Sequence, residues 1–233
     1  MRLLIKILIP CVVVAAAIAL YWFTKPSPFN TNNPLLAKQG PIDLLADLDT
    51  NDLPEGWAHR KFLTVKPADY RMTEEDGVPV LRCSTNNSAS ILARDTEIPL
   101  SSHSVLSWRW KVTTPIVSDT DESTKEGDDH PIRFFITFSN ENSDRSAMEI
   151  IWSNKKYQPG DYKIIGDFYH YVANGLDENT GKWFEHTVDL KQIYKDIGGT
   201  GTPTLQTIGF FCDSDNTGSS SDAVFANIAL SPQ

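Results

Sequence analysis

The chain contains 233 residues, of which 40% are hydrophobic and 22% are charged, a balance typical of a globular protein. Its formal net charge of −9 excludes duplex nucleic acid as an expected partner, because such binding depends on basic side chains that neutralise phosphates. The sequence contains no HExxH, CxxC, GxSxG, P-loop or GxGxxG motif, so it gives no sign of the enzyme classes that those motifs identify.

The start of the chain is typical of an export signal. Arg2 and Lys6 precede an apolar run over residues 7–23. Ala17 and Ala19 offer the small residues that cleavage requires, whereas the length of the run and its aromatic end suit an uncleaved membrane anchor. Both alternatives stay open, with the anchor favoured. We expect a protein held in the inner membrane by this N-terminal helix, with its folded part in the periplasm; the cleaved alternative is free in the periplasm.

Residues 26–51 are rich in Pro, Asn and Asp and are expected to form a linker, with a short helix over 41–48. Beyond the linker, apolar residues recur with the period of two that is typical of β-strands. Strands are predicted over residues 60–65, 79–84, 89–94, 104–112, 131–139, 147–153, 161–173, 182–190, 205–212 and 223–230. One stretch, 190–198, has a helical pattern. Short strands without βαβ alternation predict an all-β fold, an antiparallel β-sandwich over residues 52–233, preceded by the signal helix over 1–25.

Three of the predicted strands have one polar face. Large apolar side chains share one side of these strands, while Arg109, Arg133 and Glu149 lie on the other. If the strands are neighbours, the three charged residues gather on one face, either as cross-strand ion pairs or as ligand contacts. Asp128 and Asp129, in an acidic stretch before the second of these strands, complete the predicted ligand-binding set.

A loop with alternating acids follows the strand over 205–212. Asp213, Asp215 and Asp222 offer the carboxylate oxygens that calcium prefers, and D-S-D-N-T-G resembles the first half of a calcium-binding loop. The distal Glu of an EF-hand is absent, and no helices are expected beside the loop. A calcium site in a β-loop and a series of turns capped by their own Asp and Asn side chains are the two alternatives.

Two cysteines, Cys83 and Cys212, follow the leader. An oxidising compartment permits one disulfide between them. Two buried free thiols are the equal alternative.

Several blocks of the sequence resemble a known family. In chain order they are LPEGWAHRKF, ADYRM, GVPVLRCSTNNSASIL, LSWRWKV, EGDDHPIRFFITF, EIIWSN and DSDNTGSSSDAVFANIAL. Together they resemble the bacterial exported family catalogued as domain of unknown function 3047, from about residue 52 to residue 230. The resemblance implies no established reaction. The family is similar in general appearance to jelly-roll, galactose-binding-like carbohydrate-binding modules, although Asn227 stands where such modules often carry a calcium-binding acid.

The expected function is therefore a membrane-anchored periplasmic binding module without catalytic activity, with a glycan or another envelope component as ligand and calcium as an assisting ion. One alternative is a hydrolase or lyase acting on envelope polysaccharide, in which Arg109, Arg133, Glu149, Asp128 and Asp213 would converge at one end of a sheet. The other alternative is a structural envelope protein that binds a protein partner.

Overall fold

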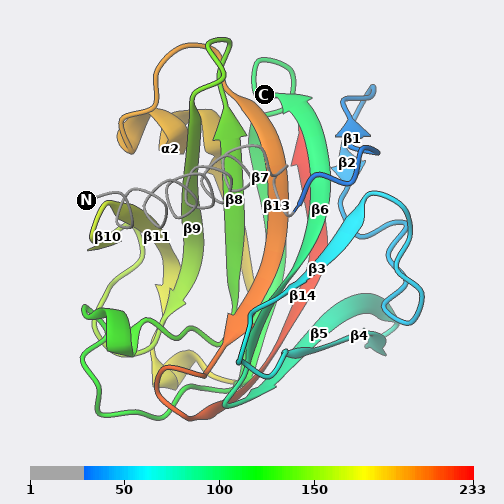
Figure 1. The fold of residues 1–233 in the computed structure, drawn as a ribbon. Helices are drawn as coiled ribbons and strands as arrows, with labels where there is room; N and C mark the ends of the chain where they lie inside the picture. The colour runs from blue at the N-terminus through cyan, green and yellow to red at the C-terminus, as the bar shows by residue number, and fades with distance from the viewer. Residues whose placement is uncertain (1–28) are drawn as a thin grey trace, which may run out of the picture.

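The computed structural model describes residues 29–233, which form two β-sheets packed face to face (Figure 1). The predicted signal helix over residues 1–25 lies outside the described residues. Within 29–233, no helix has the length and apolar character needed to cross a membrane. The β-sandwich expected from the alternation of apolar and polar residues is thus confirmed.

The larger sheet has eight strands among the described residues. In spatial order they are β1 (Leu35–Leu36), β6 (Ala89–Pro99), β13 (Thr204–Asp213), β8 (Arg133–Ser139), β9 (Arg145–Ser153), β11 (Phe168–Gly175) and β10 (Tyr162–Ile165), with β3 (Trp57–Lys61) also paired to β6. Most neighbours are antiparallel, but β1 runs parallel to β6 and β11 runs parallel to β9. The large sheet is therefore mixed rather than purely antiparallel.

The smaller sheet has six strands within the described part of the chain. In spatial order they are β12 (Phe184–Asp189), β7 (Val105–Thr114), β14 (Ser220–Ser231), β5 (Val78–Asn86) and β4 (Asp69–Glu75), with β2 (Ile42–Asp43) also paired to β14. Short helices interrupt the strands: η1 (Lys125–Gly127), η2 (Asp177–Asn179) and α2 (Leu190–Asp196). Asp189 caps α2 by accepting a hydrogen bond from the Lys191 N–H.

The core between the sheets is aromatic. Trp108 and Trp110 on β7 meet Phe134 on β8, with ring centroids 5.3 and 6.0 Å apart, and Trp152 on β9 lies 6.4 Å from Trp110. All four side chains are almost completely buried. Each such ring contact adds about 0.5–1.5 kcal/mol beyond the burial of its area, so this cluster holds the two sheets together.

Two further links join the sheets at one end of the core. Cys83 on β5 and Cys212 on β13 form a disulfide, with their Cα atoms 6.4 Å apart. Beside it, the Tyr70 hydroxyl of β4 lies 2.9 Å from the carbonyl oxygen of Phe210 on β13. The disulfide and this hydrogen bond therefore tie β4 and β5 of the small sheet to β13 of the large one.

Most of the expected strands are present with shifted bounds, but several elements differ; β1, η1 and η2, for example, were not expected. The predicted strand over 161–173 divides into β10 and β11, which form a hairpin. Strand β4 was not predicted, because its polar residues hide the alternation. The helix expected over 41–48 does not form: Ile42 lies in β2, and both Ile42 and Leu44 are buried in the core, so this segment packs onto the sandwich.

Candidate functional site

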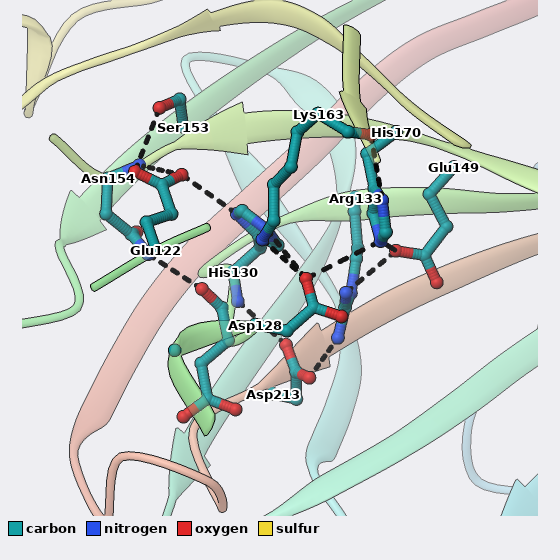
Figure 2. Close-up of polar contacts among 12 residues, drawn as sticks. Glu122, Asp128, His130, Arg133, Glu149, Ser153, Asn154, Lys163, His170 and Asp213 are labelled. Carbon is teal, nitrogen blue, oxygen red and sulfur yellow. Dashed lines mark hydrogen bonds and ion pairs between the residues drawn. The ribbon is translucent and has the colours of Figure 1, made fainter. Parts of the chain in front are cut away.

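A row of charged side chains crosses the outer face of the large sheet. The strand register aligns Phe135, Glu149, His170 and Lys163 across β8, β9, β11 and β10. Arg133 lies one row away, two residues before Phe135 on the same side of β8. These four charged or titratable side chains face away from the aromatic core, yet each is at most 4% exposed (Figure 2).

Arg133 neutralises two buried carboxylates. Its Nη1 donates a hydrogen bond of 2.7 Å to Glu149 Oε2, and its Nη2 donates to Asp213 Oδ2. Burial alone would lower the pKa of Arg133, but the charges of Asp213 and Glu149 outweigh burial and raise it. Burial raises the pKa of Asp213 well above its usual range, and the nearby Asp129 carboxylate adds to this rise. The three side chains form one hydrogen-bonded ion-pair unit.

Asp128, from the turn after η1, is the centre of a second unit. Its Oδ1 accepts a hydrogen bond of 2.5 Å from Lys163 Nζ, and it lies 3.5 Å from the Nε2 atoms of both His130 and His170. Burial opposes ionisation of Asp128, but its contact with His170 and the charge of Arg133 hold its pKa well below the usual range. Asp128 is therefore an anion that Lys163 balances.

His130 is a neutral member of this unit. Its Nδ1 lies 2.7 Å from the Trp152 carbonyl oxygen, which can only accept, so Nδ1 carries the proton. Its Nε2 then accepts a hydrogen bond of 3.0 Å from Lys163 Nζ. Burial, aided by the charge of Lys163, lowers the pKa of His130 to about 4, in agreement with this tautomer.

A group of three carboxylates lies next to Arg133. Oxygen atoms of Asp129, Asp213 and Asp215 lie within 4.8 Å of one another. Asp129 fixes the loop after β13, because its Oδ2 accepts hydrogen bonds from the Thr217 N–H (2.7 Å) and hydroxyl (2.6 Å). Burial and the Asp129 charge raise the pKa of Asp215. Clustered carboxylates of this kind fit a hard divalent cation such as calcium, which takes oxygen ligands.

Asp222 does not join this group, although the sequence analysis assigned it to the metal site. It lies on β14 opposite Ser84, where its carboxylate accepts two hydrogen bonds from Arg82 (2.9 and 2.7 Å) and one from the Ser84 hydroxyl (2.6 Å). Asp129, which had been predicted as a ligand contact, takes the third position instead. The loop before β14 folds back onto Asp129, whereas Asp222 is already part of the strand ladder.

Arg109 is also separated from the other predicted ligand-binding residues. It lies on β7 of the small sheet, with its Nε 3.2 Å from Glu185 Oε1 and its guanidinium 4.9 Å from the Trp183 ring centroid. Arg133 and Glu149 lie on the large sheet. The expectation that these three residues share a face was wrong, because alternation within a strand does not tell which sheet the strand joins.

A hollow opens on the outer face of the large sheet, beyond the charged row. The strand register aligns Asp95, Thr207, Thr137 and Ala147 across β6, β13, β8 and β9. The hollow has a volume of about 290 Å³, and its lining includes Asp95, Thr137, Arg145, Ala147, Gln206 and Thr207. Carboxylate, hydroxyl, amide and guanidinium groups thus offer donors and acceptors side by side.

Comparison with known proteins identifies the family. Residues 55–229 match the family described as "Protein of unknown function (DUF3047)". The chain belongs to this family. The resemblance seen in the sequence blocks is confirmed. No curated protein matches this DUF3047 member.

Several solved structures are similar to this DUF3047 member in fold. The Family 11 carbohydrate-binding module of the cellulase Lic26A-Cel5E of Clostridium thermocellum is 13% identical, with a TM-score of 0.42 over 84% of this chain and 97% of that one. Endoglucanase cel12A from Rhodothermus marinus is 9% identical, with a TM-score of 0.41 over 76% and 92%. The xyloglucanase domain of NopAA from Sinorhizobium fredii is 15% identical, with a TM-score of 0.40 over 77% and 95%. Similarity at this level carries no conclusion about function.

Sequence reasoning missed three members of the site in this DUF3047 chain. His130, Lys163 and His170 are separated in sequence and show no metal-binding or catalytic spacing. They meet because β11 runs parallel to β9 and β10 pairs with β11, while Asp128 reaches them from the η1 turn. The one local signal was an acidic turn, Asp128–Asp129, directly before a core strand.

Proposed function

We propose that the protein is a non-catalytic binding module of the cell envelope, which takes a glycan or another hydroxyl-rich component on the outer face of its large sheet. The observation that carries this proposal is the hollow of about 290 Å³, whose accessible lining includes Thr137, Arg145 and Gln206. A sugar hydroxyl both donates and accepts hydrogen bonds, so it suits a surface where both kinds of group alternate.

The state of Glu149 supports a binding role without catalysis. A general acid or base must come within hydrogen-bond reach of the reacting group. Glu149 is 3% exposed, and its Oε2 already accepts from Arg133 and lies 3.4 Å from His170 Nε2. We infer that Glu149 shapes the sheet face rather than reacting with a ligand.

The proposal includes the location of the protein in the cell and a bound calcium ion. The apolar run over residues 7–23 supports an inner-membrane anchor, with the sandwich in the periplasm. The carboxylates of Asp129, Asp213 and Asp215 support calcium as an assisting ion that would stiffen the loop end of the sandwich.

Binding to a glycan array and to isolated cell-wall material tests the proposal. Arg145→Ala and Thr137→Val, both in the hollow, should each weaken retention at least about tenfold, which corresponds to about 1.4 kcal/mol. Arg109→Ala is the matched control, because it removes an arginine from the opposite outer face. Absence of any retained material with the unmodified protein, or equal loss with Arg109→Ala, would contradict the proposal.

One observation favours the hydrolase or lyase alternative. Arg133, Glu149, Asp213 and Asp128 do converge at one end of the large sheet, and the Asp128 side chain is 20% exposed. An assay for new reducing ends or unsaturated products from envelope polysaccharide decides between the two functions. Product from the unmodified protein but not from Asp128→Asn would establish the enzyme and replace the binding module.

A further inference from the structure

The turn between β9 and β10 forms a concave set of hydrogen-bond donors. The Asn154 N–H donates to Glu122 Oε1 at 2.9 Å, and the N–H groups of Lys155 and Lys156 donate to Glu122 Oε2 at 3.0 and 3.1 Å. The Ser153 hydroxyl adds a fourth donor at 3.1 Å (Figure 2). Successive backbone N–H groups that point to one spot form an anion-binding nest.

The anion in this nest belongs to a distant part of the chain. Glu122 comes from the loop before η1, and its side chain is 5% exposed. Burial would raise the pKa of Glu122, but the N–H donors of the turn and the Ser153 hydroxyl outweigh burial and lower it, so the carboxylate is ionised. The nest is therefore built to hold a full negative charge.

The remaining contacts between this loop and the nest are weak. Lys155 Nζ donates to the Ser118 carbonyl oxygen at 2.6 Å, and Lys156 Nζ donates to Asp121 Oδ1 at 3.0 Å. Both lysine side chains are about half exposed, at 49% and 48%. Exposed contacts of this kind contribute about 0–1 kcal/mol, so they do not prevent an exchange of the anion.

A hollow of about 380 Å³ opens beside the nest, lined by Glu122, Asn154, Lys155, Lys156 and Thr217 among others. Asn154 is 8% exposed, and its Oδ1 has no hydrogen-bond partner among residues 29–233. A buried acceptor without a donor is costly and points to a ligand that supplies one. A hydroxyl group of the ligand would supply this donor.

The charges around the hollow are balanced when Glu122 is left out. Lys155 and Lys156 lie beside Asp119 and Asp121. When Glu122 leaves, the N–H groups of the nest lack their anion, so the nest itself suits an acidic ligand.

We propose that the 153–156 turn is a binding site for the carboxylate or phosphate group of an acidic sugar, and that Glu122 occupies this site until the ligand replaces it. The hydroxyls of the sugar would satisfy Asn154 Oδ1. This site is separate from the hollow on the large sheet, so its failure leaves the proposed function untouched. An attached carboxylate competes at an effective concentration in the millimolar range, so free monosaccharides bind weakly and multivalent acidic chains bind better.

Amide NMR of the unmodified protein tests the site directly. Glucuronate and inorganic phosphate are the two probes, with glucose as the neutral control. The amide resonances of Asn154, Lys155 and Lys156 should shift with an anionic probe at tens of millimolar and not with glucose. A larger effect of glucuronate indicates a uronate ligand, and a larger effect of phosphate indicates a phosphorylated one; both outcomes support the site. No shift of these amides with either anion overturns it.

Variants of the loop provide the second measurement. Glu122→Gln removes the competing charge and keeps the side-chain volume, so it should bind the preferred anion at least about tenfold more tightly than the unmodified protein. Glu126→Gln is the matched control, because Glu126 is an exposed acid on the same segment that does not line the hollow; it should bind like the unmodified protein. Equal affinity of Glu122→Gln and the unmodified protein, with both folded, contradicts the exchange.

Discussion

At the scale of single residues, Arg133 determines the state of its surroundings. It is 3% exposed and forms ion pairs with Glu149 and Asp213 at the same time. A buried charge is tolerated only when a partner compensates it, and here one cation compensates two anions. Loss of the cation would leave both carboxylates buried without a counter-charge.

Arg133→Met should therefore lower the free energy of unfolding by roughly 3–5 kcal/mol, as expected when one member of a buried ion pair is removed. Urea denaturation followed by tryptophan fluorescence measures this change. Arg109→Met is the control, because its partner Glu185 is 77% exposed; it should cost about 1 kcal/mol or less. Similar losses in the free energy of unfolding for the two variants would show that the ion pairs of Arg133 stabilise the fold no more than a surface ion pair does.

His186 gives the fold a dependence on pH. Its ring lies 5.0 Å from the Trp108 ring, and its Nε2 has no hydrogen-bond partner in the described part of the chain. Burial lowers the pKa of His186 from 6.5 to about 4. Between these values the unfolded chain binds a proton that the folded chain does not, so stability falls as the pH falls from about 7 to 4.

His186→Phe keeps the ring and removes this proton, so it should reduce the loss of stability between pH 7 and pH 4 by about 1 kcal/mol, a value discounted for partial exposure. Urea titrations at pH 7, 5.5 and 4 measure it. Part of the pH dependence should remain in the variant, because burial lowers the pKa of His130 in the same direction. An unchanged pH profile in His186→Phe would contradict the assignment.

At the scale of elements, the loop between β13 and β14 is held by its own acids. Asp129 binds Thr217, and the His130 N–H donates to Asp213 Oδ1 at 2.9 Å, so the loop is joined to the segment before β8. Within residues 29–233, Asp213 pairs with Arg133 and Asp129 binds Thr217, whereas Asp215 makes no ion pair, so it is the residue whose loss affects a cation most selectively.

Calcium should raise the midpoint of thermal unfolding relative to the protein in chelator. At a hundredfold excess over Kd a native-state site adds ~2.7 kcal/mol. Each kcal/mol moves the midpoint of a chain of this size by about 2–4 °C, so a rise of roughly 5–10 °C is expected. Asp215→Ala should abolish the rise, while Asp222→Ala should retain it, because Asp222 binds Arg82 instead. No rise in the unmodified protein would make the loop a turn without metal.

The strands could be predicted from sequence because each buries one face, as the alternation around Trp108 and Trp110 shows. The sheet that each strand joins could not be predicted, because the alternation of apolar and polar residues is the same in both sheets. Arg109 and Arg133 therefore fell on opposite faces. The carboxylate group was predicted in part: Asp213 and Asp215 share a loop, but Asp129 joins them only because that loop folds onto it through Thr217.

At the scale of the whole molecule, the disulfide closes a large loop. Cys83 and Cys212 are 129 residues apart in sequence and connect the two sheets. In the chain-entropy model a bridge of this span contributes at most ~5 kcal/mol, mainly by restricting the unfolded chain. The effect is independent of the aromatic contacts that hold the folded sheets together.

Reduction should therefore lower the thermal midpoint by roughly 10 °C, which is the range expected for a few kcal/mol in a chain of about 200 residues. Calorimetry with and without reductant measures it, and mass spectrometry after thiol alkylation confirms the state of the two cysteines. An identical midpoint after complete reduction would contradict a stabilising bridge.

The pairing of β3 and β1 with β6 has a consequence for solubility. Strand β6 is eleven residues long, and β3 covers its Ser90–Arg94 portion while β1 covers Thr96–Glu97. An uncovered strand of that length offers unpaired N–H and C=O groups on which another chain can add. The segment from Leu35 to Lys61 thus covers this edge of the sheet. A shortened protein that begins after Lys61 would leave this side of β6 unpaired and would be prone to associate with itself through that strand.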